Sequence, residues 1–221
     1  MWRRLLVVLA VAAPLLSASD VDAKRKKRRR TGDNLPAGFV WPANKAMKRV
    51  GKRCLDRLDA LAVGWKPGKA ARKVVTPVLV PKMEIAGISM ITIFRKPPFV
   101  MDCHLAEALA EHGQVLYDLG VRTLKFSSIH RYTKVRVNGR TLDKLSRHAL
   151  GLAIDVWSVI DADGVEHVVK TDYAPGDELL LAIEQAVNDS GGFRAVLTPA
   201  NDPESHDDHF HLEAKVDYAS R

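Results

Sequence analysis

Three histidines lie within six residues near the C-terminal end of the sequence. The segment reads Ser-His-Asp-Asp-His-Phe-His, and its histidines are His206, His209 and His211. If this segment is a strand, His209 and His211 point to the same face, because side chains alternate along a strand. Two adjacent imidazoles make a poor core and a good site for a divalent cation. The cluster indicates metal binding or catalysis, and a solvated polar strand edge is the alternative.

A second polar group lies upstream, in the segment Ser146-Arg-His-Ala-Leu-Gly-Leu-Ala-Ile-Asp155. His148 follows polar, loop-forming residues, whereas Asp155 interrupts the apolar run Leu152–Ile160. An aspartate in such a strand is costly to desolvate unless it is paired or bound to a metal. Metal ligation is one explanation for Asp155. An ion pair with Arg147, or hydrogen bonds from the backbone, is the structural alternative.

Together, the two groups offer the ligands of a catalytic zinc site. Two imidazole nitrogens and one carboxylate oxygen leave a fourth tetrahedral position for water, which is how catalytic zinc sites are built. The two cysteines of the chain cannot supply the Cys quartet of a structural site. Nitrogen-rich ligands favour zinc, although the Irving–Williams order leaves other divalent metals open.

The two segments also carry a family resemblance. Ser-x-His-x-x-Gly-x-Ala-x-Asp, followed by His-x-x-His-x-His, resembles the bacterial extensin-like C-terminal domain family, from about Cys54 to the C-terminus. That family is grouped with the zinc peptidases that include penicillin-insensitive murein endopeptidases and D-Ala-D-Ala dipeptidases, and with the hedgehog signalling domain. The resemblance implies a hedgehog/DD-peptidase-like α+β fold, in which a small antiparallel sheet carries the metal site between flanking helices.

The resemblance also implies roles for the polar residues. The positions that match the zinc ligands are His148, Asp155 and His211. His209 matches the residue that acts as general base in the murein endopeptidase branch. His206 matches a further active-site histidine, which lies behind the ligands or touches the substrate.

Two further positions match residues that shape the loop, and a third, one of two arginines, matches a residue that binds substrate. Ser146 and Gly151 match motif positions that shape the loop rather than do chemistry. Relatives carry a cysteine in a Tyr-x-Cys-Arg segment, whereas this chain has Tyr132-Thr-Lys-Val-Arg136 without one. The substrate-binding arginine is therefore either Arg131 or Arg136.

The function that follows is a zinc-dependent peptidase that hydrolyses a peptide bond in peptidoglycan, with stem peptides as substrate. Endopeptidase and carboxypeptidase action both fit the motif. The alternative is a catalytically silent, zinc-bearing domain that binds cell wall or a protein partner. The position of His209 beside His211 favours the enzyme, because a binding domain has no need of a general base.

Helices and strands that could position these residues follow from the apolar periodicity. Helices are expected after Asn44, from Asp102 to Gly120, and from Asp177 to Gly191. Strands are expected over Val74–Val80, Ile85–Phe94, Arg122–Ile129, Leu152–Ile160, Val165–Lys170 and His209–Ala214. Helices followed by mostly adjacent strands predict an α+β fold with an antiparallel sheet.

The two cysteines, Cys54 and Cys103, fall on the first and second expected helices. An even count in an exported protein favours a disulfide, which would join these two helices. Two free, buried thiols are the alternative.

The charge of the chain is concentrated at its N-terminus. Residues 1–30 hold nine of the 34 basic and two of the 26 acidic residues, so residues 31–221 have 25 basic against 24 acidic residues. A nucleic-acid-binding surface should lie on the folded domain, so a nearly neutral domain argues against a nucleic-acid partner.

The N-terminal segments indicate export. Residues 1–23 combine two arginines, a short apolar stretch and a small-residue cleavage site, which is typical of a signal peptide. An uncleaved membrane tether is the alternative. Residues 24–43 are expected to form a basic, disordered linker, which could contact an anionic wall or membrane surface weakly. Residues 44–221 then form the zinc peptidase domain of a periplasmic or secreted protein.

Overall fold

The structure is a computed structural model that describes residues 34–94, 96–137 and 139–219. The expected signal peptide and the basic run 24–30 lie outside the described residues. The described part of the expected linker, residues 34–43, lies against the domain: Asn34 Nδ2 donates to the Leu145 carbonyl at 3.2 Å, and Ala37 forms a β-bridge with Asp217. Among the described helices, none is long and apolar enough to cross a membrane.

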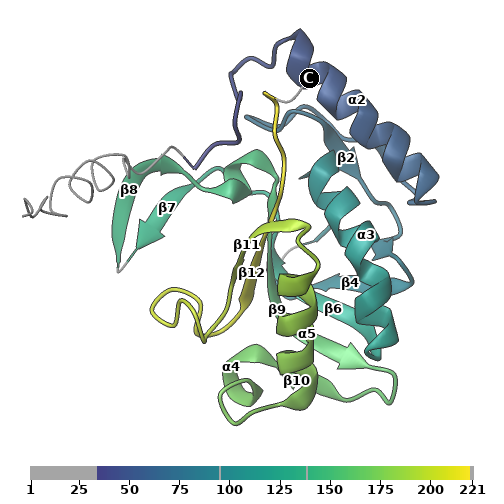
Figure 1. Ribbon diagram of the computed structural model, residues 1–221, viewed down its shortest axis with the longest axis vertical. Helices are drawn as coiled ribbons and strands as arrows, with labels where there is room; N and C mark the ends of the chain where they lie inside the picture. Colours follow the sequence, from purple (N-terminus) through teal and green to yellow (C-terminus); the bar gives the residue numbers. More distant parts are fainter. Residues whose placement is uncertain (1–33, 95, 138, 220–221) are drawn as a thin grey trace, which may run out of the picture. The chain divides into compact units, whose positions relative to one another are not determined.

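A seven-stranded sheet forms the centre of the fold (Figure 1). Its order is β11-β12-β9-β6-β4-β3, and β10 pairs with β9 outside this path. The strands are β3 (Glu84–Ile85), β4 (Ile88–Thr92), β6 (Val121–Ser128), β9 (Ala153–Asp161), β10 (Glu166–Val168), β11 (Phe193–Leu197) and β12 (Phe210–Ala214). The α+β prediction is confirmed, and the strands that bear on the site are antiparallel.

One pair of strands departs from the expected antiparallel arrangement. Strands β4 and β6 are parallel, with Met90 opposite Leu124. The chain between them forms the helix α3 (Cys103–Asp118). A helical crossover carries the chain back to the end of the sheet at which β4 began, so β6 runs in the same direction.

The expected strand Ile85–Phe94 is interrupted. Ala86 and Gly87 have φ values of 52° and 75°, in the left-handed region that strands do not use. The chain therefore turns there, and β3 and β4 pair as a short hairpin. The β-branched composition of the segment concealed this turn.

The described residues form three long helices, and the sequence predicted all of them. They are α2 (Lys45–Ala60), α3 and α5 (Glu178–Asp189), and Figure 1 shows α2 lying along α3. Each begins at a capping side chain, Asn44, Asp102 or Asp177, whose oxygen accepts a backbone N–H of the first turn. The described chain also contains two single-turn helices, η1 (Arg147–Leu150) and α4 (Val169–Asp172).

The predicted disulfide is present. Cys54 on α2 and Cys103 on α3 are bonded, with a Cα–Cα distance of 6.1 Å. Both residues are fully buried, so the bridge joins the two helices inside their contact. The alternative of two free thiols is therefore wrong.

Two smaller sheets complete the described chain. A three-stranded sheet contains β1 (Lys66–Pro67), β2 (Pro77–Leu79) and β5 (Met101–Asp102). A hairpin of β7 (Lys134–Val137) and β8 (Arg140–Leu145) extends from the body in Figure 1. Its strands are largely exposed, and the alternation Lys-Val-Arg-Val of β7 is too short a signal for the sequence analysis to have assigned it.

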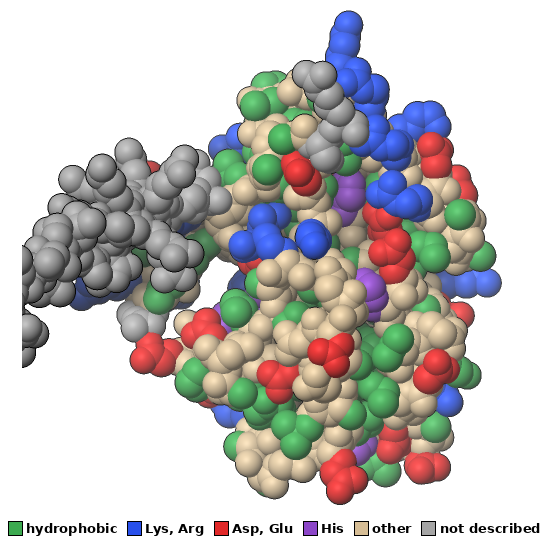
Figure 2. Space-filling view, viewed as in Figure 1, with side chains coloured by type: hydrophobic (Ala, Val, Ile, Leu, Met, Phe, Trp, Pro, Cys, Tyr) green, Lys and Arg blue, Asp and Glu red, His purple; other side chains and the backbone are tan. Residues whose placement is uncertain are grey.

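Basic side chains gather over α2 on the face shown in Figure 2. This helix carries Lys45, Lys48, Arg49, Lys52 and Arg53. The folded domain therefore has a basic surface of its own, although residues 31–221 are nearly neutral in total.

Candidate metal centre

Asp155 and His211 lie directly opposite each other on neighbouring strands. Antiparallel pairing of β9 and β12 sets Asp155 across from His211, and Ile154 across from Leu212. Because side chains alternate, His211 and Asp155 point away from the face on which Leu212 joins the core. Asp155 is 2% and His211 6% exposed, so both polar groups are removed from water.

His148 reaches the same place from η1, just before β9. Ser146 caps this turn by accepting the His148 N–H at 3.3 Å. Gly151 ends it with φ of 68°, and a Cβ at this position would lie 2.8 Å from the Asp102 backbone nitrogen. The motif serine and glycine therefore fix the turn that carries His148.

Three acceptor atoms converge between η1, β9 and β12. His148 Nε2 lies 2.9 Å from Asp155 Oδ1 and 3.2 Å from His211 Nδ1. His211 Nδ1 lies 2.7 Å from the same carboxylate oxygen. These residues form one of the groups in the described chain that could hold a metal ion.

The outer ring nitrogens of both histidines are already engaged as donors. His148 Nδ1–H donates to the Ile129 carbonyl at 2.7 Å, and His211 Nε2–H donates to Glu213 Oε1 at 3.2 Å. The neutral rings therefore turn two lone pairs toward a carboxylate oxygen. Three acceptors this close repel one another unless a cation or extra protons lie between them. The donor set fits a zinc ion, since such outer hydrogen bonds are typical of metal-ligating histidines.

The pKa values of Asp155 and His211 also show that this cluster stabilises positive charge. Burial would raise the pKa of Asp155, but hydrogen bonds from three histidines hold it far below its usual range. Burial lowers the pKa of His148. For His211, hydrogen bonds to Asp155 and Glu213 outweigh burial and raise the pKa to about 9. The two rings differ because only His211 faces two carboxylates.

Glu213 is a site residue that the sequence reasoning missed. It is 5% exposed, accepts from His211, and its other oxygen lies 2.5 Å from Arg194 Nη2. Burial would raise the pKa of Glu213, but the hydrogen bond from His211 and the charges of Arg194 and the buried Arg147 lower it. The available signal was the period of two, which places Glu213 on the same strand face as His211.

His209 and His206 lie beside the three acceptors. His209 Nε2 is 3.4 Å from Asp155 Oδ1, and its Nδ1 is 2.6 Å from Asp208. Burial would lower the pKa of His209, but these carboxylates raise it above its usual value. His206 bonds to Asp202 at 3.0 Å, and its ring centroid is 4.9 Å from that of His209.

The two candidate arginines lie in different places. Arg131 Nη2 is 3.1 Å from Asp155 Oδ2, and its side chain is 44% exposed. Arg136 lies on the exposed hairpin strand β7, opposite Thr141. The partner of Asp155 among the arginines is thus Arg131, whereas the sequence suggested Arg147.

Comparison with known families bears on this site. Residues 52–220 match the family described as extensin-like protein C-terminus. This match covers more than half of the chain. The protein belongs to this family. The region that defines the extensin-like domain contains η1, β9, β12 and every residue of the candidate metal centre. No curated protein and no solved structure matches the chain.

Proposed function

We propose that the extensin-like domain is a zinc-dependent peptidase that hydrolyses a peptide bond in peptidoglycan. The observation that carries the proposal is the convergence of His148 Nε2, Asp155 Oδ1 and His211 Nδ1, each a lone-pair atom, at 2.7–3.2 Å. Three such ligands leave a tetrahedral zinc ion with a free position. The substrate class rests on the resemblance to murein endopeptidases and D-Ala-D-Ala dipeptidases.

In this proposal, His148, Asp155 and His211 hold the ion through the three converging atoms. A bound zinc ion supplies Lewis acidity and brings the pKa of a water molecule toward about 7. Ile129 and Glu213 keep the two ligand rings in the tautomer that binds metal, because each accepts the outer N–H.

His209 is the proposed general base. In the neutral ring, donation of Nδ1–H to Asp208 leaves a lone pair on Nε2, which lies 3.4 Å from Asp155 Oδ1. This nitrogen accepts a proton from the attacking water and returns one to the leaving amine. A catalytically silent metal domain has no use for a second imidazole oriented in this way.

Arg131 is the better placed of the two arginines for substrate. It reaches the edge of the ligand cluster through Asp155, and nearly half of its side chain remains accessible. A guanidinium in this position can bind a carboxylate of a stem peptide, or the oxyanion that forms at the scissile carbonyl.

The experiment is mass spectrometry of the fragments that the zinc-loaded protein releases from purified peptidoglycan. Matched reactions contain His209→Ala, which removes the base, and His112→Ala, which removes a histidine on α3 outside the site. Defined peptide fragments from the wild type and His112→Ala, but not from His209→Ala, would support a hydrolase and identify the bond.

The opposite result is equally informative. If the wild type binds zinc stoichiometrically and releases no fragments, the peptidase proposal fails. The catalytically silent domain that binds cell wall or a protein partner would then be the better account of the site.

A further inference from the structure

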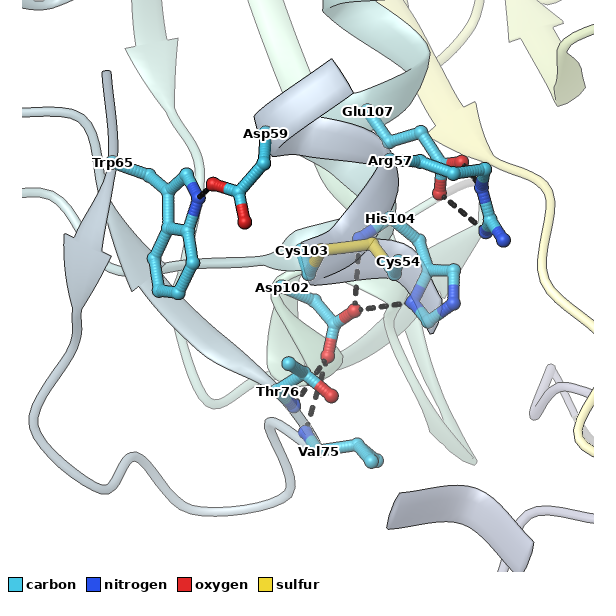
Figure 3. Close-up of a disulfide and its surroundings, with 10 residues drawn as sticks. All are labelled: Cys54, Arg57, Asp59, Trp65, Val75, Thr76, Asp102, Cys103, His104 and Glu107. Carbon is cyan, nitrogen blue, oxygen red and sulfur yellow. Dashed lines mark hydrogen bonds and ion pairs between the residues drawn. A yellow bond between two sulfur atoms is a disulfide. The ribbon is translucent and has the colours of Figure 1, made fainter. Parts of the chain in front are cut away.

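A second group of metal-ligand residues lies at the junction of α2 and α3. Ligand atoms of Cys54, His104 and Glu107 all lie within 4.8 Å of one another, and all three residues are buried. Figure 3 shows the Cys54–Cys103 disulfide between the Asp102–His104 pair and the Arg57–Glu107 pair. This group shares no residue with the metal centre on η1, β9 and β12.

His104 is held in the tautomer that binds a metal. Its Nδ1–H donates to Asp102 Oδ1 at 2.7 Å, while Asp102 Oδ2 accepts the backbone N–H groups of Val75 and Thr76. Nε2 therefore carries a lone pair. This atom is buried and has no hydrogen-bond partner among the residues that the structure describes. A carboxylate behind a histidine is the usual support of a metal ligand.

The Cys54 sulfur cannot bind a metal while it is part of the disulfide. In the bridge it is bonded to Cys103, whereas a metal requires the thiolate. A dithiol reductant breaks the S–S bond, yields two protein thiols and is itself oxidised to a cyclic disulfide. Metal binding then displaces the proton of the Cys54 thiol into solvent.

We propose that reduction of the Cys54–Cys103 disulfide creates a second metal site, formed by Cys54 Sγ, His104 Nε2 and the Glu107 carboxylate. A set of one sulfur, one nitrogen and one oxygen ligand suits a borderline-soft divalent cation of the zinc class. The ion would hold α2 and α3 together in place of the disulfide. The oxidised protein lacks this site, because its sulfur is not available.

Access and charge are compatible with this site. A cleft of about 340 Å³ is lined by His104 and Glu107, and gives an ion a route from solvent. Glu107 is paired with Arg57, whose side chain is 46% exposed. Because nearly half of the Arg57 side chain is exposed, it can turn toward solvent when a cation replaces it as the partner of Glu107.

Cobalt titration of two single-cysteine variants tests the proposal. Cys103→Ser and Cys54→Ser both lack the disulfide, but only Cys103→Ser keeps the proposed ligand sulfur. We expect Cys103→Ser to bind one more cobalt ion per chain than Cys54→Ser, with a thiolate-to-cobalt charge-transfer absorption. The centre at His148, Asp155 and His211 has no sulfur ligand, so its occupancy does not produce this absorption. Equal titrations of the two variants would overturn the proposal.

If the cysteine variants fail to fold, the reduced wild-type protein provides the test of the second metal site. After reduction with a phosphine, the wild type should gain the charge-transfer absorption, and reoxidation should abolish it. His104→Ala should remove it, whereas His112→Ala, a change at a second histidine of α3, should retain it. Absence of the absorption from the reduced wild type, or its persistence in His104→Ala, would contradict the assignment.

Discussion

His209 and His211 are two residues apart, yet their ring nitrogens have different partners. The ring nitrogens of His211 are hydrogen-bonded to Asp155 and Glu213. His209 is hydrogen-bonded to Asp208, and its Nε2 lies 3.4 Å from Asp155 Oδ1. In the proposed mechanism these neighbouring histidines therefore have different roles, His211 as ligand and His209 as base.

These partners predict opposite losses in two variants. His211→Ala should lose stoichiometric zinc, because it removes a ligand. His209→Ala should keep the zinc and lose about 100- to 10,000-fold in turnover, the usual contribution of a general base. Metal analysis and peptide-release assays on the same preparations measure both. Undiminished turnover of His209→Ala would remove His209 from the mechanism.

Glu213 should contribute to metal affinity although it does not contact the ion. Replacing it with glutamine weakens the acceptor for His211 and the ion pair with Arg194. We expect zinc to bind about 10- to 100-fold more weakly in Glu213→Gln, the usual effect of losing such support. The control is Glu184→Gln, which alters a carboxylate bonded to Thr198 and Tyr173 instead. An unchanged zinc dissociation constant would show that Glu213 does not support metal binding.

At the scale of elements, η1 depends on the glycine that ends it. Gly151→Ala places a side chain at φ of 68° and a Cβ 2.8 Å from the Asp102 nitrogen. We expect a loss of more than about 1 kcal/mol in the free energy of unfolding, from backbone strain and this contact together. Gly164→Ala has a similar φ of 83° with nothing near its Cβ, so it isolates the strain. Equal denaturation midpoints for the two variants would show that the contact is harmless.

Strand β10 is fixed to its neighbours by His167. Its two ring nitrogens lie 2.7 Å from Asp177 Oδ2 and 3.2 Å from Asp161 Oδ2. Only the imidazolium can donate to both carboxylates. These hydrogen bonds outweigh the opposing effect of burial and raise the pKa of His167. Its contribution to stability is therefore complete below the unfolded pKa and lost as the pH rises through the folded pKa.

Chemical denaturation at two pH values measures this contribution. The wild type should exceed His167→Gln in the free energy of unfolding by about 1 kcal/mol near pH 5.5, and by less near pH 9. Glutamine does not titrate, so it serves as the pH-independent reference. A difference that is the same at both values would contradict the assignment to charge.

For the molecule as a whole, the disulfide closes a loop of 49 residues that includes β1 to β5. In the chain-entropy model, a loop of this length corresponds to about 4 kcal/mol of stability. Reduced protein, denatured in the presence of a chelator, should therefore unfold with a free energy lower by about this amount. A loss well below 1 kcal/mol would show that packing of α2 on α3 suffices without the bridge.

The sequence by itself determined the elements whose signals are local. Asn44, Asp102 and Asp177 cap helices where their side chains reach the first turn, and apolar spacing marks the buried faces. The sequence also indicated the types of the site residues. It contains two histidines at a spacing of two and an aspartate within an apolar strand, and both features are unusual. These features depend only on residues a few positions apart, so they can be recognised without knowledge of the tertiary structure.

The tertiary structure alone decided which residues meet. The register that sets His211 against Asp155 joins positions 56 residues apart, and no local pattern specifies it. The same holds for the support by Glu213 and Ile129, for the pairing of Asp155 with Arg131 rather than Arg147, and for the parallel pair β4–β6. Each depends on how distant strands pair around a shared core, and that is fixed only when the whole chain buries its apolar faces together.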